Sequence, residues 1–188
     1  MKHVYITMMT VLAMTLTACQ QTAVEVTSMK VEMLENPVGL GTTTPRFSWQ
    51  LASEMQDVRQ TSYRIQVARS EKELKSETNL IWDTGDVSGD ESVLIPYSGE
   101  TLTSREVYYW RVKARTSVGE TPWSETGQWS MALLNGSEWQ AKWIGEDALD
   151  NPGETDKGNT RLAARYLRKP FENEGRVQRA VLYICGLG

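Results

Sequence analysis

Short stretches in which apolar and polar residues alternate recur along this chain and limit it to a fold built of β-strands. The longest alternates four apolar residues with polar neighbours: Tyr108, Trp110, Val112 and Ala114. Because successive side chains of a strand point to opposite faces, this period of two predicts strands with one buried face. The other expected strands are 30–33, 46–51, 62–67, 80–82, 92–95 and 123–131. Residues 71–75 allow one helical turn.

These strands, spaced by Gly, Pro, Ser and Asp, favour two packed sheets over residues 29–133. Leu102 precedes Tyr108 at a spacing similar to that of the tyrosine corner in fibronectin type III domains. Trp49 corresponds to the tryptophan that such domains bury against the same strand. The chain has only two cysteines, one of them Cys19, so the inter-sheet disulfide of antibody domains is excluded. We therefore predict an all-β chain whose main domain is a fibronectin type III-like β-sandwich.

Residues 134–188 predict a junction followed by the incomplete start of a second β-sandwich domain. Strand patterns resume at 163–167 and 180–184, after an acidic stretch at 146–159 that we expect to be a solvated loop. Two strands do not bury a core by themselves. Four apolar residues are therefore expected to remain partly exposed: Val181, Leu182, Tyr183 and Ile184.

The N-terminus has the parts of a bacterial lipoprotein signal. Lys2 gives a basic start, and the uncharged run 4–16 is shorter than the roughly 20 residues of a transmembrane helix. The run ends in Leu16-Thr17-Ala18-Cys19, the pattern that a lipoprotein peptidase recognises. An ordinary signal peptide followed by a chance cysteine is the alternative. We predict a signal peptide over 1–18, a lipid on Cys19 and a tether over 19–28.

A lipid on Cys19 would hold the mature chain on a membrane outside the cytoplasm. A thioether-linked diacylglycerol brings two acyl chains, which is sufficient for stable anchoring. Gln20 and Gln21 follow the cysteine in place of the Asp that often retains lipoproteins in the inner membrane. The sequence therefore favours the outer membrane.

The composition excludes several classes of function. His3 is the only histidine and lies in the expected signal, so the mature chain has neither a Ser-His-Asp triad nor a histidine zinc site. Only carboxylates, Lys and Tyr are left for acid–base chemistry. Loss of Lys2 with the signal leaves 19 basic and 24 acidic residues in the mature chain. This excess of negative charge argues against a nucleic-acid partner. We expect no cofactor and no metal.

Two clusters of polar residues are candidates for binding or catalysis. Four carboxylates share one Gly- and Ser-rich connection: Asp83, Asp86, Asp90 and Glu91. A solvated turn is the favoured interpretation, with a calcium loop or a catalytic pair as alternatives. The polar row of the longest strand consists of Tyr109, Arg111, Lys113 and Arg115. We interpret it as a solvated sheet face, with a docking surface as the alternative.

Five tryptophans are candidates for sugar contact: Trp82, Trp123, Trp129, Trp139 and Trp143. Alternation places Trp123 and Trp129 on one strand face, which favours packing. Trp139 and Trp143 flank the junction and are therefore the candidates for sugar or inter-domain contact.

An ordered set of motifs resembles the N-terminal region of bacterial α-L-rhamnosidases of glycoside hydrolase family 78. In the sandwich these are Glu35-Asn36-Pro37-Val38-Gly39-Leu40, Pro45-Arg46-Phe47-Ser48-Trp49, residues 60–68, Trp82-Asp83-Thr84-Gly85, residues 108–112 and Pro122-Trp123-Ser124-Glu125. At the junction the motif is Glu138-Trp139-Gln140-Ala141-Lys142-Trp143-Ile144-Gly145, followed by 166–169 and 179–184. Cys185 stands where the family often has a small or hydroxyl residue, and we expect a buried, inert thiol.

The resemblance implies a non-catalytic portion of an enzyme that removes terminal α-L-rhamnose from glycans or glycosides. Such enzymes invert the anomeric centre with two carboxylic residues of an (α/α)6 barrel. No segment of this sequence matches that barrel, so no catalytic residue is assigned and the chain is expected to be inactive. The alternative is a stand-alone, surface-anchored β-sandwich that binds carbohydrate or protein.

Overall fold

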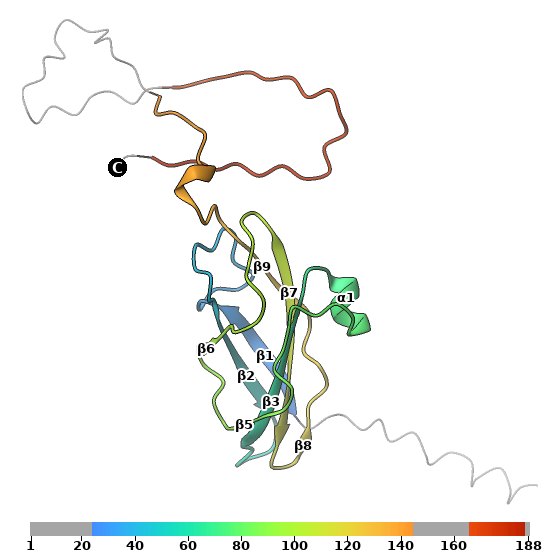
Figure 1. The fold of residues 1–188 in the computed structure, drawn as a ribbon. Coiled ribbons are helices and arrows are strands. Elements are labelled where there is room, and N and C mark those ends of the chain that lie inside the picture. The colour runs from blue at the N-terminus through green and yellow to red at the C-terminus, as the bar shows by residue number, and fades with distance from the viewer. Residues whose placement is uncertain (1–23, 145–165, 187–188) are drawn as a thin grey trace, which may run out of the picture. The chain divides into compact units, whose positions relative to one another are not determined.

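The computed structural model describes residues 24–144 and 166–186 (Figure 1). The expected signal peptide, Cys19 and the acidic stretch 146–159 lie outside these residues. The chain divides into one unit that ends at Trp139 and a second that begins at Gln140. Within the described ranges, no helix has the length and apolar character needed to cross a membrane.

Two antiparallel sheets form the first unit (Figure 1). The smaller sheet has the order β1 (Val24–Val31), β2 (Arg46–Ser53) and β6 (Ile95–Pro96). The larger has the order β4 (Trp82–Asp83), β3 (Gln60–Ala68), β7 (Val107–Thr116) and β8 (Gly119–Glu120), with β5 (Val87–Ser88) on β3 and β9 (Gly127–Ser130) on β7. Helix α1 (Glu71–Ser76) follows β3, and the short helix η1 (Gly136–Glu138) follows β9. The predicted all-β sandwich is confirmed.

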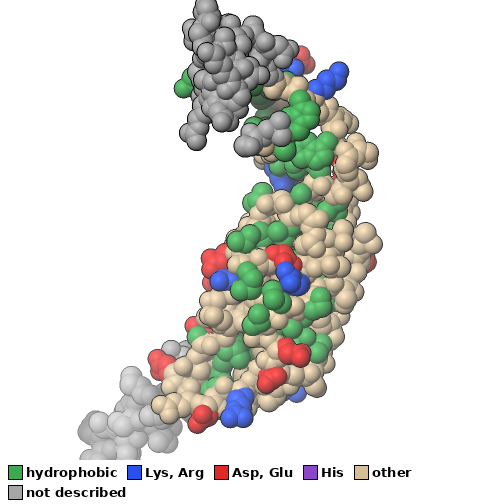
Figure 2. Space-filling model, turned by 90° about the vertical axis from the view of Figure 1, so that its left-hand side faces the viewer, with side chains coloured by type: hydrophobic (Ala, Val, Ile, Leu, Met, Phe, Trp, Pro, Cys, Tyr) green, Lys and Arg blue, Asp and Glu red, His purple; other side chains and the backbone are tan. Residues whose placement is uncertain are grey.

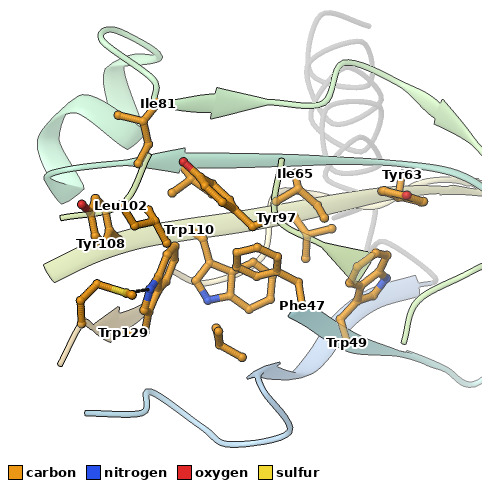
Figure 3. Packing of buried hydrophobic residues seen from close by; sticks show 14 residues of the cluster. Phe47, Trp49, Tyr63, Ile65, Ile81, Tyr97, Leu102, Tyr108, Trp110 and Trp129 are labelled. Atoms are coloured by element: carbon orange, nitrogen blue, oxygen red, sulfur yellow. Dashed lines mark hydrogen bonds between the residues drawn. The ribbon is translucent and has the colours of Figure 1, made fainter. Parts of the chain in front are cut away.

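Aromatic rings from both sheets fill the space between them (Figure 3). Phe47 of β2 is fully buried, and its ring centroid lies 4.6 Å from that of Trp110 and 5.5 Å from that of Trp129. Trp110 and Val112 of β7 are buried on the same side of that strand. Tilted and edge-on ring contacts of this kind add stability beyond the area they bury. The apolar alternation of the sequence therefore identified the core face correctly.

The tyrosine corner predicted from the spacing of Leu102 and Tyr108 is present. Both residues are buried, and the Tyr108 hydroxyl accepts a 2.8 Å hydrogen bond from the backbone N–H of Thr103. Trp49 is also buried, with its ring 5.1 Å from Tyr63 on β3 and its Nε1 donating to Gln60 at 3.0 Å. The contacts of Trp49 connect the two sheets, whereas the bond to Tyr108 fixes the connection that leads into β7.

The first strand differs from the prediction at both ends. β1 begins at Val24, and residues 24–27 pair with β2 rather than belonging to a tether. It ends at Val31, where the expected strand 30–33 is interrupted by a tight turn. Glu32 and Met33 both have positive φ, and Val31 and Leu34 exchange two backbone hydrogen bonds. β5 and β8 were not predicted, because two-residue strands leave no periodic pattern to detect.

The turn at Glu32 and Met33 predicts a stabilising substitution. Positive φ at both central residues is typical of a type I′ turn, which favours glycine. Met33→Gly should therefore raise the free energy of unfolding by about 0.5–1 kcal/mol, because left-handed backbone strains a residue with a Cβ. Met55→Gly, at an equally exposed methionine without positive φ, is the control and should give no gain. Equal effects of the two substitutions in urea unfolding would contradict the strain argument.

The segment Asn36–Leu40 covers the free edge of β9. Leu40 N–H donates to the Ser130 carbonyl at 2.8 Å, and Ser130 N–H donates to the Pro37 carbonyl at 3.0 Å. The Asn36 side chain accepts from the backbone N–H of Gln128 at 2.9 Å. An exposed sheet edge invites pairing with other chains, so this loop protects the sandwich from aggregation.

The described residues of the second unit do not form a strand, and the expected strand 163–167 lies mostly outside them. No described residue of 166–186 is helical or extended in a sheet, and the expected strand 180–184 is wrong. Leu182 is 82% and Ile184 is 80% exposed, while Val181 and Tyr183 are partly exposed, as anticipated for an unfilled core. Cys185 is exposed rather than buried, because no second sheet packs against this segment in the described residues.

Candidate functional site

The polar row of β7 is the most structured polar feature of the sandwich. The Arg111 side chain is only 10% exposed. Its Nε and Nη2 donate to the Gln66 side-chain oxygen at 3.0 and 2.7 Å, and Nη2 also donates to Glu77 at 2.8 Å. The guanidinium lies 4.2 Å from the Trp123 ring centroid. The expectation of a solvated face is therefore wrong at Arg111, which a cation–π contact and a buried amide enclose.

Trp123 lies on the opposite side of the sheet from Trp129, although alternation placed the two together. Residues 121–126 precede β9 and do not form a regular strand. The Thr121 hydroxyl accepts from Ala114 N–H, and the Ser124 hydroxyl accepts from Val112 N–H, each at 3.0 Å. The two hydroxyls accept hydrogen bonds that backbone carbonyls would accept in a regular strand paired with β7. Simple alternation therefore does not hold between Trp123 and Trp129.

The remaining charges on this face are paired with one another. Lys113 and Arg115 both contact Glu120, the latter at 3.6 Å, and Arg64 contacts Asp83 at 2.6 Å. On the face shown in Figure 2, acidic and basic side chains likewise lie side by side and apolar groups are scattered. Paired charges leave little net field to attract a charged partner. The row is therefore a structural network.

Asp83, in the carboxylate-rich connection, accepts hydrogen bonds from two side chains of β3. Arg64 donates to it at 2.8 and 2.6 Å, and Gln66 donates at 3.0 Å. The hydrogen bonds from Arg64, aided by Gln66, lower the pKa of Asp83 to about 2. Across the described residues, no three acidic, histidine or cysteine side chains are grouped to hold a metal ion. Both carboxylate oxygens of Asp83 are thus engaged by the ion pair with Arg64.

The ion pair predicts a change in acid stability. The folded pKa of Asp83 lies below its ordinary value of 3.8, so its contribution is present above about pH 4 and disappears as the pH falls toward 2. Solvent screening limits this contribution to about 1 kcal/mol. At pH 6 the free energy of unfolding of Asp83→Asn should be lower than that of the parent by this amount. On acidification to pH 2.5 the free energy of unfolding should fall less in the variant than in the parent. Asp90→Asn, from the same connection, should match the parent, and equal behaviour of both variants would refute the assignment.

An open groove of about 430 Å³ lies beside β1 and the residues that lead into β9. Three carboxylates line it, from Glu25, Glu35 and Glu125. No aromatic side chain is among the described residues that line the groove. Since sugar sites usually provide a ring for stacking, this groove is poorly suited to carbohydrate.

The tryptophans fall into two groups. Trp129 is buried, and Trp82 packs against Tyr97 at 5.1 Å, so both serve the core. Trp139 is 42% exposed at the end of the first unit, and Trp143 is 69% exposed in the second. These two therefore retain the surface that a sugar or a neighbouring domain would need.

The chain leaves the sandwich through a hydrogen-bonded turn. The Glu138 carboxylate accepts from the Ser104 hydroxyl at 2.6 Å and from the backbone N–H of Asn135 at 3.0 Å. The bond from Ser104 is the main cause of the lowered pKa of Glu138. Asn135 followed by Glu at the third helical position is the sequence signature of a capping box, so this feature was detectable before the structure. In contrast, no sequence motif indicated that Gln66 and Glu77 would bind Arg111.

A family model of Rha78A-like, N-terminal immunoglobulin domains matches residues 26–135. The chain belongs to this family. The matched range begins within β1 and ends just before η1, so the Rha78A-like domain corresponds to the sandwich. Its start lies near residue 29, at which we expected the sandwich to begin.

The Rha78A-like domain is similar to parts of α-L-rhamnosidases. A Streptomyces avermitilis α-L-rhamnosidase is 39% identical over 127 residues, which are 67% of this chain and 12% of that protein. A Formosa agariphila α-L-rhamnosidase is 35% identical over 158 residues, which are 84% of this chain and 17% of that protein. The chain thus spans less than a fifth of either relative.

Solved structures agree on the fold. The Streptomyces avermitilis α-L-rhamnosidase complexed with L-rhamnose has 40% identity and a TM-score of 0.62, over 65% of this chain and 12% of that one. The structure of α-L-rhamnosidase from Dictyoglumus thermophilum has 33% identity and a TM-score of 0.62, over 65% and 14%. Both matches therefore support the β-sandwich fold, over a small part of each enzyme.

Proposed function

We propose that this chain is the non-catalytic N-terminal portion of a lipid-anchored α-L-rhamnosidase that hydrolyses terminal α-L-rhamnose from glycans or glycosides. The carrying observation is the match of residues 26–135 to an N-terminal domain of such enzymes. The inverting reaction needs two carboxyl groups across a cleft. Asp83 is engaged by Arg64, and the groove beside β1 lacks a ring for stacking. The catalytic carboxylates accordingly belong to another domain of the enzyme.

The sandwich would act as a spacer between the membrane and that domain. Val24 pairs with Ser53 at one end of β1, whereas Leu40 pairs with Met131 near the other end. Entry and exit therefore lie at opposite ends of the sheets (Figure 1). β7 extends for ten residues, or about 30 Å.

Lipidation of Cys19 is tested by mass spectrometry of the chain purified from bacterial membranes. We expect loss of residues 1–18 and the added mass of a diacylglycerol on Cys19. Cys19→Ser should leave the chain unlipidated and absent from the membrane fraction. Cleavage without a lipid on Cys19 would reduce the signal to an ordinary secretory one.

The enzyme assignment is tested by reading the coding DNA downstream of the Gly188 codon. A region that encodes a helical barrel, in frame or shifted, supports the proposal. Its absence favours the alternative, a stand-alone module that binds carbohydrate or protein.

Exposure of Trp139 and Trp143 is the observation that favours this alternative. Titration with L-rhamnose, followed by tryptophan fluorescence, would detect binding at these rings. The signal should disappear in Trp139→Ala or Trp143→Ala if either ring carries the site. A response that persists in both variants would place the binding elsewhere.

A further inference from the structure

We propose that the end of the sandwich at which the chain enters rests on the lipid surface through Met55 and Val118. The inference depends on the lipid anchor at Cys19 proposed above. It adds an orientation, in which one defined end of the sheets contacts the membrane. The partner of the two apolar side chains at this end is the lipid bilayer.

The segment between Cys19 and β1 is short. Only five residue steps separate Cys19 from Val24, where the first sheet begins. A fully extended chain covers at most about 3.6 Å per residue, so the Cα of Val24 is held within about 18 Å of the Cα of Cys19. That distance is shorter than the roughly 30 Å length of β7. The tether therefore keeps this end close to the headgroups.

Two turns lie at the end of the sandwich where the chain enters. Val24 pairs with Ser53, and the loop that contains Met55 follows at once. Thr116 pairs with Gly119 across the turn that contains Val118. Met55 is 47% and Val118 is 43% exposed. Two turns at the entry end therefore each present an apolar side chain to the surroundings.

These two turns are fixed to one another. The backbone N–H of Ser117 donates to the Arg59 carbonyl at 2.8 Å, and Arg59 N–H donates to the Ser117 hydroxyl at 3.2 Å. A preorganised pair of apolar contacts loses less conformational freedom on binding than two mobile loops would. Since anchoring already keeps the surface nearby, even weak apolar insertion is populated.

The charges at the entry end do not favour binding to anionic lipid. In the 54–59 loop, Glu54 and Asp57 are opposed by Arg59 alone. Next to the other turn, Arg115 is paired with Glu120. The entry end thus lacks the cluster of basic residues that binds anionic lipid. We therefore expect contact with uncharged, zwitterionic bilayers, without a requirement for anionic lipid.

The test uses the lipidated full chain with Cys185→Ser, so that an introduced cysteine is the only free thiol. Single cysteines at Met55, Val118 and Leu34 are labelled with the environment-sensitive dye NBD and reconstituted into phosphatidylcholine vesicles. Leu34 is the matched control, because it is 57% exposed but lies beside Val31 at the other end of β1. Vesicle flotation and the mass of the lipid on Cys19 are measured on the same samples.

We expect blue-shifted emission and quenching by doxyl-labelled lipid at positions 55 and 118, and neither effect at position 34. A similar signal in vesicles with added phosphatidylglycerol would support the apolar mode. Labels at 55 and 118 that remain as water-exposed as the label at 34, on protein that floats with the vesicles, would overturn the proposal while leaving the anchor intact. Protein that carries no lipid and does not float would overturn the anchor and, with it, this orientation.

Discussion

Replacing Gly127 by alanine should lower the free energy of unfolding of the sandwich by about 3 kcal/mol. Gly127 pairs with Trp110 at the start of β9. A Cβ at this position would lie 3.0 Å from two carbons of the Trp110 ring and closer still to Nε1. Trp110 is 1% exposed and contacts Phe47, so the ring has no free space into which to move.

Gly41→Ala provides the matched control for this substitution. A Cβ at Gly41 would have no atom within 4 Å, and its φ is not positive. We expect an effect below about 0.5 kcal/mol. Urea unfolding followed by tryptophan fluorescence measures both variants, since Trp49, Trp110 and Trp129 report on the core. Comparable stabilities of the two alanine variants would show that the packing around Trp110 is looser than described.

Replacing Arg111 by methionine should cost about 2–3 kcal/mol. Methionine keeps an unbranched apolar stem over Trp123 but removes both donors to the Gln66 side chain. Gln66 is fully buried, so its amide oxygen would lose both of these hydrogen bonds. The cost therefore comes from an unsatisfied buried acceptor more than from the lost charge.

Two further variants separate that cause from a general effect of charge. Arg115→Met removes an arginine from the same face, but its side chain is 58% exposed and its contact with Glu120 is 3.6 Å. It should cost less than about 0.5 kcal/mol. Combining Arg111→Met with Gln66→Leu should cost less than the sum of the single substitutions, because both polar partners are then removed. Strict additivity, or equal costs at Arg111 and Arg115, would contradict the network.

The core strands could be predicted from the sequence because their side chains obey a simple period. Phe47, Trp49, Trp110 and Val112 alternate with polar residues, and each is buried as expected. The tyrosine corner was also detectable, since it depends on a fixed spacing within one segment. Such local patterns can be detected because each strand of the sandwich needs an apolar residue at every second position to fill the core.

Features set by contacts between distant segments could not be predicted in this way. Trp123 changes face because the hydroxyls of Thr121 and Ser124 bond to the backbone of β7. Arg111 is buried because Gln66 and Glu77 reach it from elsewhere in the chain. The positive φ at Glu32 and Met33 ended β1 early, although neither residue type is typical of such a turn.

The candidate site was predicted less completely than the fold. Trp139 and Trp143 are exposed, and their role as sugar or inter-domain contacts stays a prediction. The carboxylates near Asp83 proved to include an ion pair with Arg64, which no spacing rule revealed. Lipidation of Cys19 stays a prediction, as that residue lies outside the described ranges.

The most direct test of the account measures hydrolysis of an aryl α-L-rhamnoside by the 188-residue chain and by the protein expressed from the extended coding region. We predict no turnover by the chain, since the reaction needs carboxylates from another domain, and release of the aryl group by the extended protein. Turnover by the 188-residue chain alone would contradict the account, as would an extended protein that leaves the rhamnoside intact.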